Sequence, residues 1–191
     1  MIAGLAVGGL LAVLLIMLSK QSPSVAAQPE AEAVQTSNAA GAPPDISNMT
    51  PRERFNRLYN RVMQAAQSGD EATVTRFTPM ALMAYAQLDT IDADARYHAA
   101  LIKVHTGEMD GSRALADTLL AKNPGHLFGY MIRGTVARFQ KNDKQLSRAY
   151  GDFLQHYDPE MKLGRPEYGE HQTSLNDFRK AALGDSGGGG S

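Results

Sequence analysis

The side chains best suited to metal or acid-base chemistry are histidines, because the chain contains no cysteine. Without cysteine there is no disulfide, no thiol nucleophile and no thiolate ligand for zinc or an iron–sulfur cluster. We recognise no metal-binding pattern among the histidines: there is no HExxH sequence, no histidine pair at i and i+4, and no carboxylate placed to complete a facial triad. We therefore expect neither a metal site nor a cofactor. The five histidines are His98, His105, His126, His156 and His171, of which the first two are seven residues apart and can share a helix face.

Patterns for other catalytic or nucleotide chemistry are also missing. Neither GxGxxG nor GxxxxGK[ST] occurs, so the usual backbone cradle for phosphates is lacking. No serine stands in a nucleophile-elbow or other local setting that would mark it as activated. The net charge is -1, and basic clusters are not interleaved with aromatic residues. We expect no enzymatic activity, no small-molecule substrate and no nucleic-acid partner.

Two basic clusters have two interpretations. They are either solvated helix faces or contacts to lipid headgroups or to an acidic partner subunit. Residues 50–183 contain 18 basic and 16 acidic side chains, so this part of the chain is nearly neutral. The first cluster is Arg54, Arg57 and Arg61, and the second is Arg138, Lys141, Lys144 and Arg148.

An apolar run at residues 2–18, IAGLAVGGLLAVLLIML, predicts a transmembrane anchor over residues 1–18. A helix of this length spans roughly 25 Å, which crosses a bilayer if Ser19 and Lys20 reach the headgroups. The alternative is a signal peptide cleaved near Ser24-Val25-Ala26, but the basic n-region of such peptides is missing.

Small residues line one face of the predicted anchor. Gly4, Gly8 and Ala12 are four residues apart, as in GxxxG-type helix pairs, and predict close packing against a second membrane helix. The alternative is a simple tether, since glycine and alanine are common in membrane helices.

The segments on either side of the central region have the composition of linkers. Residues 19–48 are rich in Ala, Pro, Ser and Gln and contain no aromatic residue, so they cannot bury enough surface to fold alone. Residues 184–191, GDSGGGGS, predict a flexible tail that is either native or a synthetic linker.

Residues 49–183 predict an all-α domain of antiparallel helical hairpins. Thr50 and Glu53 form a capping box around Pro51, and Ser68-Gly69 ends the first helix. We expect a short turn over 71–77 and a new helix at Thr78-Pro79. Further helices are expected near 93–106, 111–122, 126–141, 143–157 and 169–183, with an irregular passage over 159–167.

Part of this region resembles the tetratricopeptide repeat (TPR). Residues Gly107-Glu108-Met109-Asp110, Ala114, Leu119, Leu120 and Asn123-Pro124 are similar to the second half of a repeat. The next unit has Tyr130, Gly134, Tyr150 and Asp158-Pro159 at comparable places, and 35 residues separate its proline from Pro124. Arg96, Lys103 and Leu146 depart from the pattern, and Pro79 interrupts the second helix of a degenerate first unit. An unrelated helical bundle is the alternative.

The resemblance implies a curved stack whose concave wall, built by the first helix of each hairpin, binds a peptide or partner helix. Leu175, Phe178 and Ala182 are expected to cap the stack, with His171 and Asn176 toward water. Several wall residues are alternatively ordinary core or covered by this last helix. The wall residues would be Tyr97, Leu101, Val104, His105, Phe128, Met131, Thr135 and Arg138.

The sequence therefore predicts a membrane-anchored protein-interaction module. We expect an accessory or assembly subunit of a membrane complex, such as respiratory or light-harvesting machinery, that contacts the bilayer through its single membrane helix. Lys20 is the only basic side chain near that helix, so flanking charges do not decide its orientation. We expect a periplasmic soluble domain because an amino-terminal anchor followed by a linker and a soluble domain is the usual order in bacterial proteins that face the periplasm. The alternative is a free-standing periplasmic chaperone or peptide-binding protein.

Overall fold

The computed structural model describes residues 48–188, which form eight helices and no strand, and this confirms the predicted all-α class. The predicted anchor, its Gly4, Gly8 and Ala12 face and nearly all of the linker lie outside the described residues. No helix among residues 48–188 is long and apolar enough to cross a membrane. The helices are α1 (Pro51–Ser68), α2 (Glu71–Ala86), α3 (Ala93–His105), α4 (Met109–Lys122), α5 (Leu127–Phe139), α6 (Asp143–Lys162), α7 (Pro166–Glu170) and α8 (Gln172–Gly188).

The first helix begins and ends where the sequence predicts. The Thr50 hydroxyl accepts a hydrogen bond from the Glu53 N–H, and the Glu53 carboxylate accepts one from the Thr50 N–H at 2.9 Å. Gly69 ends α1 in the left-handed conformation at φ 72°, which glycine adopts without steric cost. The buried side chains Phe55, Leu58, Val62 and Ala65 follow helical spacing along one face.

Two prolines do not interrupt their helices, which corrects the predicted boundaries. Pro79 lies inside α2, because Asp70 already caps that helix and Phe77 and Ala81 bury its face on both sides of the proline. Pro159 lies inside α6, whose last turn is held by the buried Glu160. Each proline removes one backbone hydrogen bond, a loss that packing offsets here.

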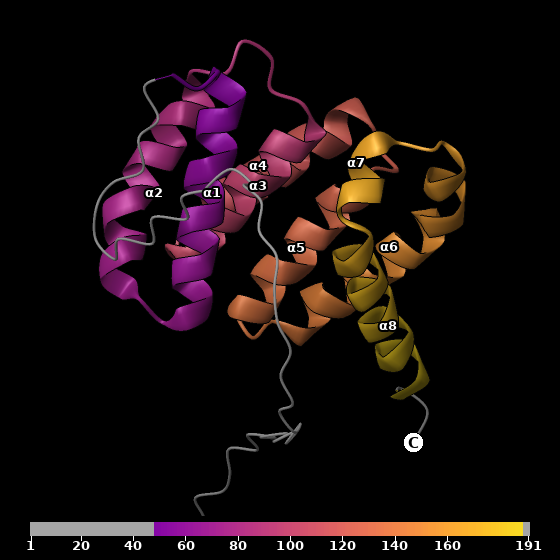
Figure 1. The fold of residues 1–191 in the computed structure, drawn as a ribbon. Helices are drawn as coiled ribbons and strands as arrows, with labels where there is room; N and C mark the ends of the chain where they lie inside the picture. Colours follow the sequence, from indigo (N-terminus) through magenta and orange to yellow (C-terminus); the bar gives the residue numbers. More distant parts are fainter. Residues whose placement is uncertain (1–47, 189–191) are drawn as a thin grey trace, which may run out of the picture. The chain divides into compact units, whose positions relative to one another are not determined.

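Helices α1 and α2, α3 and α4, and α5 and α6 form three successive antiparallel hairpins (Figure 1). The second helix of each hairpin contacts the first helix of the next, and α1, α3 and α5 also contact one another in sequence. Helix α8 packs against α6 at the end of this series. Such an array is compatible with a helical-repeat architecture, and the closer TPR assignment remains a prediction.

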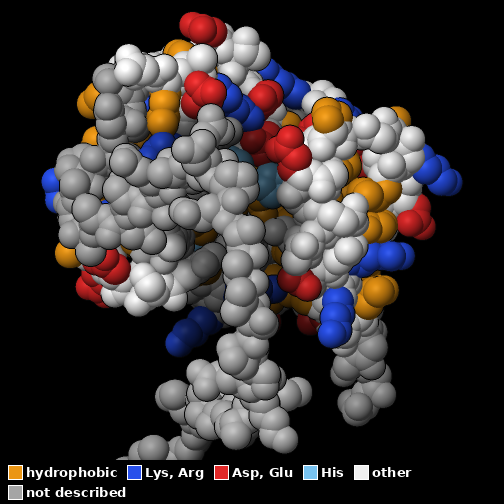
Figure 2. Space-filling model, in the orientation of Figure 1, with side chains coloured by type: hydrophobic (Ala, Val, Ile, Leu, Met, Phe, Trp, Pro, Cys, Tyr) orange, Lys and Arg blue, Asp and Glu red, His pale blue; other side chains and the backbone are white. Residues whose placement is uncertain are grey.

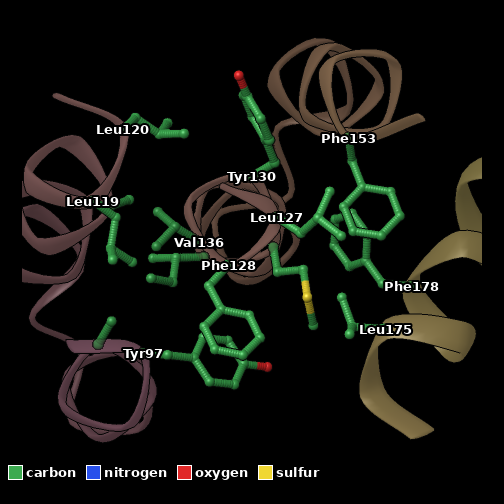
Figure 3. Packing of buried hydrophobic residues seen from close by; sticks show 14 of the residues in the cluster. Tyr97, Leu119, Leu120, Leu127, Phe128, Tyr130, Val136, Phe153, Leu175 and Phe178 are labelled. Carbon is green, nitrogen blue, oxygen red and sulfur yellow. The ribbon is translucent and has the colours of Figure 1, made fainter. Parts of the chain in front are cut away.

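Helix α3 joins two hydrophobic cores because it is buried on opposite faces. Ala95, Ala99 and Ile102 face the core built with α1 and α2, whereas Tyr97 and Val104 face the core shared by α3 to α8. In Figure 3, Tyr97 lies against Phe128 below α5, and the α8 residues Leu175 and Phe178 lie to the right of α5. The small side chains at Ala99 and Ala100 are fully buried and allow close helix approach.

The last helix covers the end of the stack, as predicted. Leu175, Phe178 and Ala182 are all buried. Phe178 lies so close to α5 that a Cβ added at Gly134 would be 2.6 Å from its ring. Glycine at this position therefore sets the distance between α5 and α8.

Candidate functional site

The structure separates the eight predicted wall residues into a buried half and an accessible half. Tyr97, Val104, Phe128 and Met131 are at most 6% exposed. Tyr97 stacks on Phe128 with ring centroids 4.4 Å apart, and the His171 ring packs against both. These four side chains belong to the core and cannot contact a partner directly in this structure. Tyr97 and Phe128 are covered by His171, which stands just before α8.

The remaining four residues lie nearer the surface. Leu101 and Thr135 are half-buried, and His105 and Arg138 are exposed. Arg138 donates a hydrogen bond to the Tyr150 hydroxyl at 2.7 Å. The His105 ring contacts the ring of Phe139, a large apolar side chain that is 50% exposed.

A groove of about 550 Å³ begins at His105 and lies between the first hairpin and the end of α3. Most of its wall is built from small or apolar side chains of α1 and α2. The His105 ring also contacts Phe139 of α5, although Phe139 itself does not line the groove. We name it the His105 groove. It is lined by Ala65, Ala66, Gly69, Glu71, Val74, Thr75, Thr78, Pro79, His105 and Thr106.

A second arrangement joins polar side chains that are distant in sequence. Oδ1 of Asp94 accepts a hydrogen bond from Nε2 of His171 at 2.7 Å and lies 3.5 Å from Nε2 of His98. The other oxygen, Oδ2, accepts one from Arg52 at 2.6 Å. The His98 ring stacks on Tyr59 with ring centroids 3.8 Å apart. We name Asp94, His98 and His171 the Asp–His–His cluster.

The environment of the cluster sets its charges. Burial alone raises the pKa of Asp94, but the hydrogen bond from His171 and the nearby positive charges hold it below its ordinary value, so the carboxylate is ionised at neutral pH. Burial lowers the pKa of His98 to about 4 despite the opposing effect of Asp94, so this imidazole is neutral. Its Nδ1 atom is buried and has no hydrogen-bond partner.

The cluster corrects two expectations from the sequence. His171 does not point to water, because it bonds to Asp94 and packs among aromatic rings, whereas Asn176 is exposed as expected. A carboxylate is also placed beside two histidines. Asp94 and His98 are four residues apart on one helix, a spacing that could have been noticed. The third member comes from 77 residues away and has no local signal.

A cleft of about 280 Å³ borders the cluster on its accessible side. Four of its lining residues are acidic and one is basic, so the cleft attracts cations. Figure 2 shows acidic side chains gathered in the centre of this face beside histidine surface. The lining residues are Arg52, Asp92, Ala93, Asp94, Pro166, Glu167 and Glu170.

A separate buried network fixes α5 to α7. His126 is fully buried, and its Nδ1 accepts a hydrogen bond from the Phe128 N–H at 3.3 Å. Its Nε2 lies 3.2 Å from Glu167. The Tyr168 hydroxyl accepts from the Leu127 N–H and donates to Glu160, each at 2.9 Å. These bonds satisfy the first amides of α5 and position the segment leading to His171.

Comparison with protein-family models, curated proteins and solved structures gives no match to this chain.

Proposed function

We propose that this chain is a membrane-anchored protein-interaction module, an accessory or assembly subunit of a membrane complex. The observation that carries the proposal is the His105 groove, an accessible groove of mixed apolar and polar side chains between two helical hairpins. Surfaces of this kind accept apolar side chains of a partner segment, with polar groups at the rim fixing its position.

The hairpin array gives the groove a rigid frame. Phe55 and Phe77 are buried between α1 and α2, and Ile102 joins this core from α3, so the helices that line the groove are held in place before a partner binds. A preformed site binds more tightly than one that must be ordered during binding. This arrangement supports docking rather than transient capture of many clients.

The occupant that fits is an amphipathic segment of a partner subunit. Its apolar side chains would enter the groove and pack on the exposed ring of Phe139. Arg138 and Lys141 stand next to Phe139 in the chain and are exposed, so acidic side chains on the polar side of that segment would find cations nearby.

The predicted membrane segment supplies the second half of the proposal. An uncharged run of 17 residues at positions 2–18 is long enough to anchor the domain, and its small-residue face suits a neighbouring helix. Two contacts on one chain, one in the bilayer and one at the groove, would raise the overall affinity through effective concentration.

Two matched charge substitutions test the groove. Thr75 is exposed and lines it, whereas Ala121 on α4 is exposed and does not. The full chain carrying Thr75→Glu or Ala121→Glu is purified in mild detergent from its native membrane, and the ratio of co-purifying subunits is measured by mass spectrometry. We expect a fixed-ratio set of subunits with wild type and Ala121→Glu and a smaller yield of that set with Thr75→Glu.

Other results would redirect the proposal. Equal yields from both variants would show that the groove is not the interface. A scatter of substoichiometric proteins with wild type would favour the periplasmic chaperone or peptide-binding protein instead.

A further inference from the structure

We propose that the Asp–His–His cluster binds one divalent first-row transition-metal ion, with zinc as the reference ion. This is a site separate from the His105 groove, and it goes beyond the proposed interaction function. Two imidazoles and one carboxylate form a donor set used by such ions when part of the coordination shell is left to water or another ligand.

The distances suit a single ion. One ligand atom from each of Asp94, His98 and His171 lies within 4.8 Å of the other two. Around a tetrahedral zinc ion, ligand atoms stand roughly 3.3 Å apart, given metal–ligand bonds of about 2.0 to 2.1 Å. The 3.5 Å between Asp94 and His98 is already close to that value, and the 2.7 Å hydrogen bond from His171 would open as the ion replaces its proton.

Only one of the three ligand side chains, that of His171, would have to shift for an ion to bind, and the shift is small. Asp94 and His98 are fixed by their places on α3 and by the stacking of His98 on Tyr59. His171 stands at the junction of α7 and α8 rather than inside a helix.

The charges around the cluster favour a cation. Oδ2 of Asp94 is held by Arg52, which leaves Oδ1 facing both histidines. Such outer hydrogen bonds orient a metal ligand. Asp92, Glu167 and Glu170 also line the adjoining cleft and outweigh the charge of Arg52.

The adjoining cleft reaches one member of the cluster. Asp94 lines it, whereas His98 and His171 do not. Three protein ligands leave at least one coordination position for water on that side. A bound ion would join α3 to the junction of α7 and α8, and would add a link between the second hairpin and the segment that caps the stack.

Cobalt and zinc binding to the full chain test the proposal. The protein is purified in detergent without a polyhistidine tag, freed of metal with a chelator, and titrated with Co²⁺ by visible absorption and with Zn²⁺ by calorimetry. We expect one ion per chain and a d–d band that zinc abolishes. His98→Gln and His171→Gln should each weaken binding by roughly tenfold or more, whereas His105→Gln and His156→Gln should leave it unchanged.

A measurement on the unmodified chain remains decisive if a variant fails to fold. Zinc is added while the imidazole carbon-bound proton signals of all five histidines are followed by NMR. Saturating shifts confined to His98 and His171 would support the site. Absence of saturable binding would overturn it, and so would equal shifts at His105 and His156, because these would indicate weak binding to exposed side chains.

Discussion

His171, at the junction of α7 and α8, bonds to Asp94 at the start of α3 across 77 residues of sequence, with Nε2 and Oδ1 only 2.7 Å apart. This bond ties the capping segment to the second hairpin. The same carboxylate accepts a hydrogen bond from Arg52 of α1, so one side chain links the beginning, the middle and the end of the described domain.

We predict that Asp94→Asn destabilises the domain in the absence of metal. The substitution keeps the shape but removes a buried charge that holds His171 and Arg52, and we expect a loss of about 2 kcal/mol in the free energy of unfolding by urea. Asp117→Asn is the control, because the pair of Asp117 with Arg133 is exposed and should contribute less than about 1 kcal/mol. Equal effects of the two substitutions would contradict a central role of Asp94.

A second prediction concerns the contact between α5 and α8. In Gly134→Ala the added methyl would meet the Phe178 ring, which is itself packed against Tyr150 and Phe153 and cannot move freely. We expect a loss of roughly 1 to 3 kcal/mol in unfolding free energy. Gly151→Ala, in open space within α6, should instead stabilise by roughly 0.5 to 1 kcal/mol. An unchanged free energy of unfolding in Gly134→Ala would show that the Phe178 ring does not fix the spacing of α5 and α8.

Histidine burial predicts a loss of stability on mild acidification. Burial lowers the pKa of His126, with the Glu167 hydrogen bond acting in the opposite direction. An unfolded histidine titrates near pH 6.5, so from about that pH downward the unfolded chain binds a proton that the folded chain does not. The free energy of unfolding should therefore fall as the pH is lowered from about 6.5 toward the folded pKa.

His126→Asn isolates this contribution. Asparagine retains an oxygen that can accept the hydrogen bond from the Phe128 N–H but has no proton to gain. Urea unfolding at pH 7.0 and pH 5.5 should show a smaller difference in the variant than in wild type. The lowered pKa values of His98 and His105 act in both proteins and cancel in this comparison. An unchanged difference would mean that His126 does not contribute.

For the predicted membrane helix, we expect Gly8→Leu to weaken association with a partner in the bilayer. Leucine would fill the small-residue face formed with Gly4 and Ala12 and keep a neighbouring helix at a distance. The circular dichroism of the full chain in detergent should show the same thermal transition, because Gly8 lies outside residues 48–188. Unchanged recovery of the complex would leave the segment as a simple tether.

Local sequence signals predict the helical class and several helix ends, but not every helix boundary and not the sites. The capping box at Thr50 and Glu53 and the end at Gly69 were predictable because each involves neighbouring residues. Pro79 misled the prediction because tertiary burial of Phe77 and Ala81 outweighs one lost hydrogen bond. The face of α3 was ambiguous from sequence since both of its sides are buried.

The wall and the cluster depend on where α8 packs, which no local pattern reveals. Phe128 and Met131 were predicted to line the wall but are buried in the core. A charge at Met131, as in Met131→Glu, would therefore unfold the domain and could not show whether the wall binds a partner. The same packing brings His171 to Asp94. His105 lines an accessible groove, but the other residues of that groove come mainly from α1 and α2 and are not those of the predicted wall.

The most direct test of the interaction function is photo-crosslinking in native membranes from the groove itself. A benzophenone amino acid is placed at Thr75, or at Ala121 as the control, and adducts are identified by mass spectrometry. The proposed function predicts one dominant adduct with a membrane-complex subunit from position 75 and none with that subunit from position 121. No adduct at position 75, or the same adducts from both positions, would contradict it.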